Sequence, residues 1–401
     1  MIALADRTTL IHESITLAVN SKAAALRKAG VDVVSFGAGE PDFDTPEFIK
    51  LAAKSALDNG QTKYTPTPCF PELREAIARK FNRENQLPYS SKQITTGAGG
   101  KFCLYLAMMT LINPGDEVII PAPYWVSYPE QVKLVGGVPV FVRGDEARDF
   151  KITPQQLTDA ITRRTRAFVI NSPSNPGGHT YSPSELKSLA EVLLKHPEIV
   201  ILSDEIYEKL VYDGTKSISF AALDPRLLER TLTFGCHSKT FAMTGWRVGY
   251  VGGPQHIIDA MNKMQSQTTS HITSFTQIPA AIALDDPRGE QRVETMRLEF
   301  QRRGQHMWKR LTALPMIRCV RPTGAFYCFP NISATFGKRI GDRAISDAVS
   351  FASSLLEQNH VAVVPGNDSG FDTHVRLSFA TSMEQIDKGI DRIGEFLKTL
   401  R

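Results

Sequence analysis

The decisive stretch of this sequence is Ser238-Lys239-Thr240-Phe241-Ala242-Met243-Thr244-Gly245-Trp246-Arg247. Its lysine follows a serine, just past a short apolar run that ends at Phe234. A lysine that attacks a carbonyl needs a partly desolvated pocket, so that its amine is neutral often enough to react. A phosphorylated group held beside it needs a hydroxyl and a guanidinium fork, which Ser238 and Arg247 could supply. An isolated Ser-Lys pair is more often a surface turn, so this interpretation needs support from the rest of the chain.

Length and composition exclude several classes of protein. The 401 residues suffice for two domains, and 42% hydrophobic with 22% charged residues is typical of a soluble globular protein. The net charge of +4 comes without a Lys/Arg cluster, so we expect no nucleic-acid partner. We also expect no membrane span and no secretory signal, because long apolar runs are missing. Five scattered cysteines without a CxxC pair suggest no disulfide framework and no metal site, and favour the cytoplasm.

A glycine-rich turn lies at Gly97-Ala98-Gly99-Gly100-Lys101. Both a dinucleotide fingerprint and a P-loop fail here, because Phe102 stands where the first needs glycine and the second needs serine or threonine. What remains is a turn that opens a helix over 101–111. The backbone amides at such a helix start form a ready phosphate site.

Two charged residues stand in apolar strands. Asp204 ends the predicted strand 200–204, and in a parallel sheet an acidic residue at a strand end often marks a functional crevice. Arg376 lies between apolar neighbours in the predicted strand 374–379. A buried arginine is costly without a partner, and a carboxylate held by two hydrogen bonds would satisfy it.

These motifs together resemble one family. The stretch from Ser238, the loop GEPDFDTP from Gly39, the segment DEIY from Asp204 and VRLSFA around Arg376 are similar to motifs of pyridoxal-phosphate-dependent class I/II aminotransferases of fold type I. The subgroup most similar is the Ib group of bacterial aspartate aminotransferases. The resemblance extends from Thr16 to the C-terminal helix, with the motifs in the family's order.

The resemblance implies a set of cofactor residues. Lys239 is the catalytic residue, which carries pyridoxal 5'-phosphate covalently and then moves protons as base and acid. Trp125 stacks on the pyridine ring, Asp204 keeps its nitrogen protonated, and Asn175 and Tyr207 reach its phenolic oxygen. The remaining cofactor contacts are Tyr64 (from the neighbouring subunit of a homodimer), Gly99, Gly100, Lys101, Ser238 and Arg247.

The resemblance also implies the substrates. Arg376, Gly39 and Asn175 would hold the α-carboxylate, with Trp125 beside them, while Thr16 and Lys101 would bind the distal carboxylate of aspartate. The predicted reaction transfers the amino group of L-aspartate to 2-oxoglutarate, through pyridoxal and pyridoxamine forms of the cofactor in a ping-pong mechanism. Thr16 could instead cap its helix.

Other functions stay open from sequence. One is an aminotransferase for aromatic or neutral amino acids, or for prephenate. Members that accept prephenate use a lysine where this chain has His12, and a histidine carries at most a partial charge near neutral pH. Another is a catalytically silent protein that uses the fold for binding or regulation.

The chain departs from the family pattern at several positions: Cys69-Phe70, Gly178, Cys236-His237 and His271. We assign no catalytic role to Cys236 or His237. Pro173 and Pro176 are candidates for cis peptide bonds.

Alternating strands and helices predict an α/β fold. The expected fold type I architecture is a large domain with a mostly parallel central sheet flanked by helices, plus a small α+β domain. We expect the small domain to combine 1–46 with 296–401, and the large cofactor-binding domain to span 47–295. A long helix near 289–314 would link them. In the last third, short strands are expected at 318–320, 324–330, 361–365 and 374–379, and a helix at 342–358.

Overall fold

The computed structural model describes residues 2–11 and 15–401, without the side chains of residues 15–17 and 20. Its largest element is a seven-stranded sheet of order β2-β8-β7-β6-β5-β3-β4. β8 is antiparallel to β2 and β7, and the other neighbouring strands are parallel to each other. The strands are β2 (Ile94–Ala98), β3 (Glu117–Ala122), β4 (Val138–Arg143), β5 (Thr165–Asn171), β6 (Val200–Asp204), β7 (Thr231–Cys236) and β8 (Val248–Gly252).

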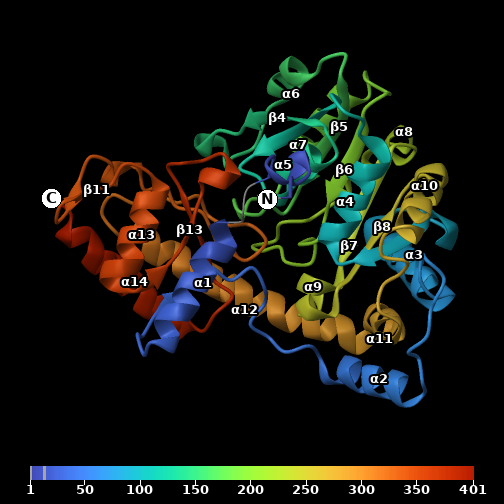
Figure 1. Ribbon diagram of the computed structural model, residues 1–401, viewed down its shortest axis with the longest axis horizontal. Helices are drawn as coiled ribbons and strands as arrows, with labels where there is room; N and C mark the ends of the chain where they lie inside the picture. The colour runs from blue at the N-terminus through green and yellow to red at the C-terminus, as the bar shows by residue number, and fades with distance from the viewer. Residues whose placement is uncertain (1, 12–14) are drawn as a thin grey trace.

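Helices cover both faces of this sheet (Figure 1). Side-chain alternation along a strand explains the two layers. In β3, Val118 and Ile120 pack with residues of α4 and α10, whereas Ile119 packs with residues of α6 and α7. The helices of this part are α2 (Glu47–Asp58), α3 (Pro71–Asn85), α4 (Gly100–Leu111), α5 (Ser127–Leu134), α6 (Pro154–Ala160), α7 (Pro183–Leu193), α8 (Pro225–Leu228), α9 (His237–Thr240), α10 (Gln255–Ser266) and α11 (Ser274–Asp285).

A second cluster of elements lies beside the sheet, where the blue N-terminal helix α1 meets the orange and red C-terminal elements in Figure 1. Val34 and Phe36 share one apolar core with side chains from the last hundred residues. The elements are α1 (Ile15–Lys28), β1 (Val34–Ser35), β9 (Tyr327–Cys328), β10 (Arg339–Ile340), β11 (Arg343–Ala344), α13 (Ala348–Asn359), β12 (Val361–Ala362), β13 (Val364–Pro365), β14 (Val375–Ser378) and α14 (Met383–Thr399).

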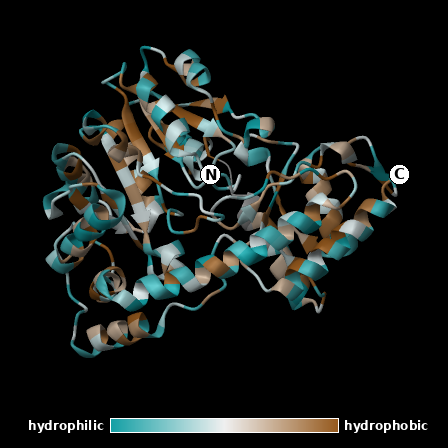
Figure 2. Ribbon diagram, turned by 180° about the vertical axis from the view of Figure 1, so that it is seen from behind, coloured by the Kyte–Doolittle hydropathy of each residue, from teal (hydrophilic) through white to brown (hydrophobic). Residues whose placement is uncertain are grey.

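The long helix α12 (Pro287–Thr312) runs along both parts. Asp286 caps its first turn by accepting from the Arg288 amide. Figure 2 shows the hydropathy pattern of this fold: the central strands are hydrophobic (brown), and the outward faces of α12 and other helices are hydrophilic (teal). Apolar strand surfaces are removed from water while charged helix faces stay solvated.

The structure corrects some predicted elements. Residues 318–320 form no strand, because only Arg318 pairs, in an isolated bridge to Asn331. The helix expected from 342 begins at Ala348, since Asp347 caps it and the preceding residues form β11. Both candidate prolines, Pro173 and Pro176, follow cis bonds, and a third cis bond precedes Pro123.

Candidate active site

The charged residues singled out by their motifs meet in one cavity of about 250 Å³. It opens where β5 and β6 end and where α9 follows β7, so the carboxyl ends of parallel strands supply much of its wall. Eight of the predicted site residues line it: Gly39, Lys101, Trp125, Asn175, Asp204, Tyr207, Lys239 and Arg376. The structure therefore brings together residues more than 300 positions apart in the chain.

Lys239 enters the cavity from the short helix α9. Its Nζ donates to the carbonyl oxygen of Gly39, on the loop that follows β1. Burial lowers the pKa of this amine to about 8, because the pocket disfavours the charged form. The neutral, nucleophilic form of the amine is therefore more populated near neutral pH than in an ordinary lysine, as carbonyl attack requires.

Asp204 ends β6 and is 1% exposed. Its carboxylate accepts from the hydroxyl of Tyr128 and, at 3.4 Å, from the Ile206 amide. Burial raises the pKa of this carboxyl to about 6. Tyr207 lies one turn further on, and its hydroxyl is 3.0 Å from that of Tyr327. A buried carboxylate with so few donors is suited to pairing with a cationic group of a ligand.

Arg376 projects from β14 and is 7% exposed. Its Nη1 donates to Asn175 Oδ1 and its Nη2 to the Gly37 carbonyl, both at 3.1 Å, while the guanidinium lies 4.6 Å from the centre of the Tyr327 ring. Its Nε is buried and has no hydrogen-bond partner. Within residues 2–11 and 15–401, no carboxylate lies within ion-pair distance of this arginine. A ligand carboxylate would satisfy both the charge and the free N–H.

Lys101 and Trp125 line the cavity next to each other. The Lys101 ammonium lies 5.1 Å from the centre of the Trp125 ring, a cation–π distance. Burial, together with the charge of Arg247, lowers the pKa of Lys101. Lys101 and Arg247 also line a neighbouring cavity of about 680 Å³. The candidate-site cavity therefore holds Lys101 as a further basic side chain besides Lys239 and Arg376.

A tight backbone turn adjoins the cavity at the start of α4. Gly99 has φ +80°, and a Cβ there would come within 2.3 Å of Arg247 Nη2. The Arg247 guanidinium donates to the carbonyls of Thr244 (2.7 Å) and Ala98 (3.1 Å). Gly100 begins the helix, so its amide and that of Lys101 have no acceptor within the helix. Amides at a helix start beside a guanidinium make an anion site.

The Cys236-His237 departure has a packing explanation. Cys236 Sγ lies 2.9 Å from Ser238 Oγ and 3.3 Å from the Val248 carbonyl oxygen, and its single S–H donates to one of the two. His237 Nε2 lies 2.9 Å from the Ala280 carbonyl oxygen, and burial lowers the pKa of this imidazole to about 4. A neutral, buried imidazole that bonds to backbone is consistent with the absence of a catalytic role for His237.

Some predicted residues lie elsewhere. Tyr64 is 92% exposed, and its ring packs edge-to-face with the His271 ring, with the two ring centroids 5.7 Å apart. One copy of the chain therefore does not bring Tyr64 to the cavity. Ser238, Gly99 and Gly100 adjoin the cavity without lining it. Thr16 belongs to α1, but its side chain lies outside the described residues, as does the whole of His12.

The sequence interpretation missed nine lining residues, among them Tyr128, Asn171 and Tyr327. Asn171 Nδ2 donates to the Asp204 carbonyl at 3.0 Å, which joins the ends of β5 and β6. Tyr128 lies three residues after Trp125, in the first turn of α5, and this spacing was the only feature of the sequence that could have placed it near the site. Tyr327 comes from β9, and no local pattern connects it with Tyr207.

The described residues contain neither a metal-binding cluster nor a membrane-spanning helix. In the part of the chain that the structure describes, no group of three or more His, Cys, Asp or Glu side chains could hold a metal ion. No helix there is both long and apolar enough to cross a membrane.

Comparisons with known proteins agree with this geometry. Residues 31–393 match the family "Aminotransferase class I and II". The chain is 48% identical to the aspartate/prephenate aminotransferase of Cereibacter sphaeroides (99% of each chain covered) and 47% identical to the aspartate aminotransferase of Geobacillus stearothermophilus (98% and 99%). The Rhizobium meliloti aspartate aminotransferase crystal structure superposes with a TM-score of 0.96 at 42% identity over 100% of both chains. The Thermus thermophilus enzyme with maleate gives 0.93 at 43% identity, covering 98% of this chain and 100% of that one. These structures confirm the predicted fold type I architecture, and the chain belongs to the class I and II aminotransferases.

Proposed function

We propose that this aminotransferase transfers the amino group of L-aspartate to 2-oxoglutarate and uses pyridoxal 5'-phosphate to do so. The observation that carries the proposal is the meeting of Lys239, Asp204 and Arg376 in one cavity. It is supported by the names of the relatives, several of which are aspartate aminotransferases at 43–48% identity over almost the whole chain.

The cavity fits the chemistry of the cofactor. Its aldehyde matches the buried Lys239 amine, whose lowered pKa of about 8 favours attack on a carbonyl. Its protonated pyridine nitrogen matches the buried Asp204 carboxylate, and its phosphate matches the Gly100 and Lys101 amides at the helix start. The Gly99 amide already donates to the Gly97 and Arg247 carbonyls, so Gly99 would shape the turn and not donate to the phosphate. Ser238 and Arg247 would complete the phosphate site, with Trp125 against the ring and Asn175 and Tyr207 at its phenolic oxygen. When bound, the cofactor stabilises negative charge at the substrate Cα.

The side chains of the cavity would have separate roles in substrate binding and proton transfer. Arg376 binds the substrate α-carboxylate with its free Nε and a shared Nη, and Gly39 and Asn175 lie beside it. The Lys239 amine, released by substrate, would accept the proton from Cα and pass it to the C4′ carbon of the cofactor. Lys101, with Thr16, binds the distal carboxylate of aspartate. The presence of both Arg376 and Lys101 in one cavity suits a dicarboxylic substrate.

The proposal also includes a homodimer, a division into two domains and a cytoplasmic location. A homodimer would bring Tyr64 of one copy to the phosphate site of the other, and its exposure of 92% in the single chain supports this. The division into a small domain (1–46 and 296–401) and a large one (47–295) is supported by the core that Val34 and Phe36 share with the C-terminal residues. The cytoplasm stays the predicted location, and all five cysteines are free thiols.

The first experiment is a visible absorption spectrum of the purified protein. We expect a band from cofactor bound to Lys239 that is lost on addition of aspartate without an oxo acid. If an aromatic amino acid or prephenate-derived amino acid converts the band and aspartate does not, the aspartate assignment is wrong. If no band forms after addition of pyridoxal phosphate, a catalytically silent protein is favoured.

A substitution at Lys101 tests the distal site separately. Lys101→Ala should lower kcat/KM for aspartate at least tenfold more than for phenylalanine, because only aspartate carries a second carboxylate. Lys133→Ala is the matched control, since Lys133 lines the neighbouring cavity and not the candidate site. Equal losses for the two substrates would contradict the role of Lys101.

Prephenate is the second candidate substrate. It is favoured by the 48% identity to a relative whose name includes aspartate and prephenate. A direct comparison of the two oxo acids as amino acceptors distinguishes a dual enzyme from one restricted to 2-oxoglutarate.

A further inference from the structure

A buried polar network lies behind the candidate site, on the opposite side of the chain segment that carries Asp204 and Tyr207. Asp204, Ile206 and Tyr207 line the cavity, but the intervening Glu205 does not. Its side chain, together with that of Ser203, faces away from the cavity, as the alternation of an extended strand requires. Glu205 is 4% exposed, so it is a buried carboxylate with no place in the mechanism described above.

Four donors surround the Glu205 carboxylate. Oε1 accepts from Ser203 Oγ at 2.7 Å and from the Phe220 amide at 3.2 Å. Oε2 accepts from Ser219 Oγ at 2.5 Å and from Asn85 Nδ2 at 3.4 Å. Burial, followed by the charge of Glu208, raises the pKa of Glu205 to about 7. Two elements distant in sequence, α3 and the segment before Phe220, thus hold one side chain.

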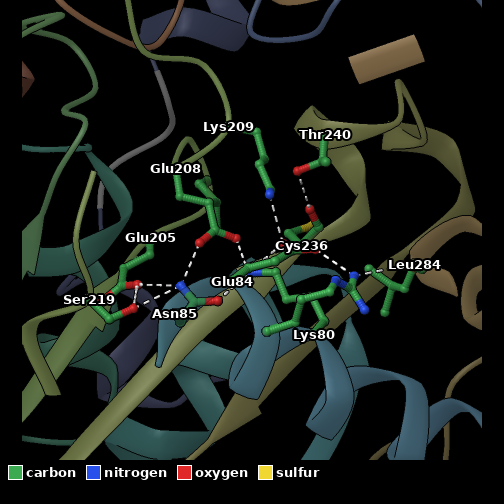
Figure 3. A network of polar contacts seen from close by, with 12 residues as sticks. Lys80, Glu84, Asn85, Glu205, Glu208, Lys209, Ser219, Cys236, Thr240 and Leu284 are labelled. Carbon is green, nitrogen blue, oxygen red and sulfur yellow. Dashed lines mark hydrogen bonds and ion pairs between the residues drawn. The ribbon is translucent and has the colours of Figure 1, made fainter. Parts of the chain in front are cut away.

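Further hydrogen bonds from Asn85 and Lys80 anchor the network to α3. Figure 3 shows Asn85 between Glu205, Ser219 and Glu208. Asn85 Nδ2 donates to Glu208 Oε2 at 2.6 Å, and Lys80 Nζ donates to Asn85 Oδ1 at 2.7 Å and also contacts Glu208. Lys80 is 2% exposed. This buried cation offsets part of the negative charge, and the network joins α3 and β6 to the turn of Glu208 and the segment of Ser219.

The side of this segment that faces the cavity makes fewer hydrogen bonds than the side that carries Glu205. The Asp204 side chain accepts only from Tyr128 and weakly from the Ile206 amide, so its position depends on the backbone from 204 to 207. That backbone is held by the Asn171 side chain on the Asp204 carbonyl, by the Glu205 amide, which donates to the Phe234 carbonyl at 3.1 Å, and by the Glu205 side chain. We propose that Glu205 is a positioning residue, which holds the turn carrying Asp204 and Tyr207 in register with the cofactor. The inference rests on the proposed function, because it concerns how tightly that cofactor binds.

A glutamine cannot replace this carboxylate. In one orientation its amide NH₂ faces the Phe220 N–H, a backbone donor that cannot reorient. In the other it faces Asn85 Nδ2, which Glu208 keeps as a donor. Either orientation sets donor against donor, and the side chain must move. Glu205→Gln therefore removes the anchor without changing the volume of the residue.

The test is the affinity of the full-length, cofactor-free protein for pyridoxamine phosphate, which binds without a bond to Lys239. Glu205→Gln should weaken binding about tenfold, and Ser219→Ala, a milder change that adds no atom, about threefold. Arg230→Lys is the control for stability. Arg230 is also buried and donates to the carbonyls of Leu193, His196 and Ile199, at the other end of the sheet. It should lower the melting temperature and leave affinity within twofold of the unsubstituted protein.

A double variant separates positioning from general stability. If Glu205 acts through Asp204, Glu205→Gln should have little further effect in an Asp204→Asn background, because coupled residues are non-additive. The inference is overturned if Glu205→Gln binds within twofold of the unsubstituted protein, or if its loss multiplies fully with that of Asp204→Asn. An unsubstituted chain that does not bind pyridoxamine phosphate would instead overturn the proposed function itself.

Discussion

Gly99 offers a sharp test of the phosphate cradle. Its φ of +80° with ψ of 163° lies in a region that is nearly restricted to glycine, and alanine there costs about 1–3 kcal/mol in backbone strain. The new Cβ would also lie 2.3 Å from Arg247 Nη2 and 2.8 Å from its Cζ, so the guanidinium must move. Arg247 then loses its bonds to the Thr244 and Ala98 carbonyls, each worth about 0.5–1.5 kcal/mol net.

The sum predicts that Gly99→Ala lowers the free energy of unfolding by about 2–6 kcal/mol. Urea denaturation of the cofactor-free protein measures this loss. A fluorescence titration with pyridoxal phosphate measures the second effect, an affinity reduced at least tenfold because Arg247 no longer faces the helix start. The two assays together distinguish a strained fold from a damaged anion site.

Gly115→Ala is the matched control. Gly115 also has a positive φ, +88°, but a Cβ there meets nothing within 4 Å. It should cost only the backbone strain, about 1–2 kcal/mol, and leave cofactor affinity unchanged. If the two variants lose equal stability and bind the cofactor equally well, the contact between Gly99 and Arg247 does not shape the site.

Two further predictions concern the lysine and its loop. Because burial lowers the pKa of Lys239 from 10.5 to about 8, the unfolded chain binds more protons between these values and stability rises with pH across that window. Lys239→Met in the cofactor-free protein should therefore gain up to about 3 kcal/mol at pH 7 relative to the unsubstituted protein, a gain that shrinks by pH 10; a difference that is independent of pH in urea unfolding would refute this. Arg303→Lys should cost about 1–3 kcal/mol in the same assay, because Arg303 Nη1 reaches both oxygens of Asp42 (2.8 and 2.9 Å) on the loop that carries Gly39. Arg302→Lys, at an exposed pair with Glu299, should cost less than about 1 kcal/mol, and a similar loss for both would contradict the clamp.

The sequence by itself determined the fold class and eight of the residues that line the site. Asp204 at a strand end and Arg376 inside a strand stand out because charge in apolar surroundings demands a partner, and that demand can be seen in a local pattern. Gly99 and Gly100 stand out because a glycine-rich turn before a helix has few other uses. Such signals are local in the chain, so sequence alone reveals them.

Only the tertiary structure decided which residues complete these positions. Tyr327 reaches Tyr207, 120 residues away, and Arg303 reaches Asp42, 261 residues away, and no periodicity encodes either contact. Tyr327 also lies against Arg376, which belongs to a different strand. Glu205 carries no sequence signal of its own either, because its importance comes from donors on α3 and on the segment of Ser219. Hydrophobic periodicity specifies which face of an element is buried, whereas the packing of elements specifies which polar groups meet there.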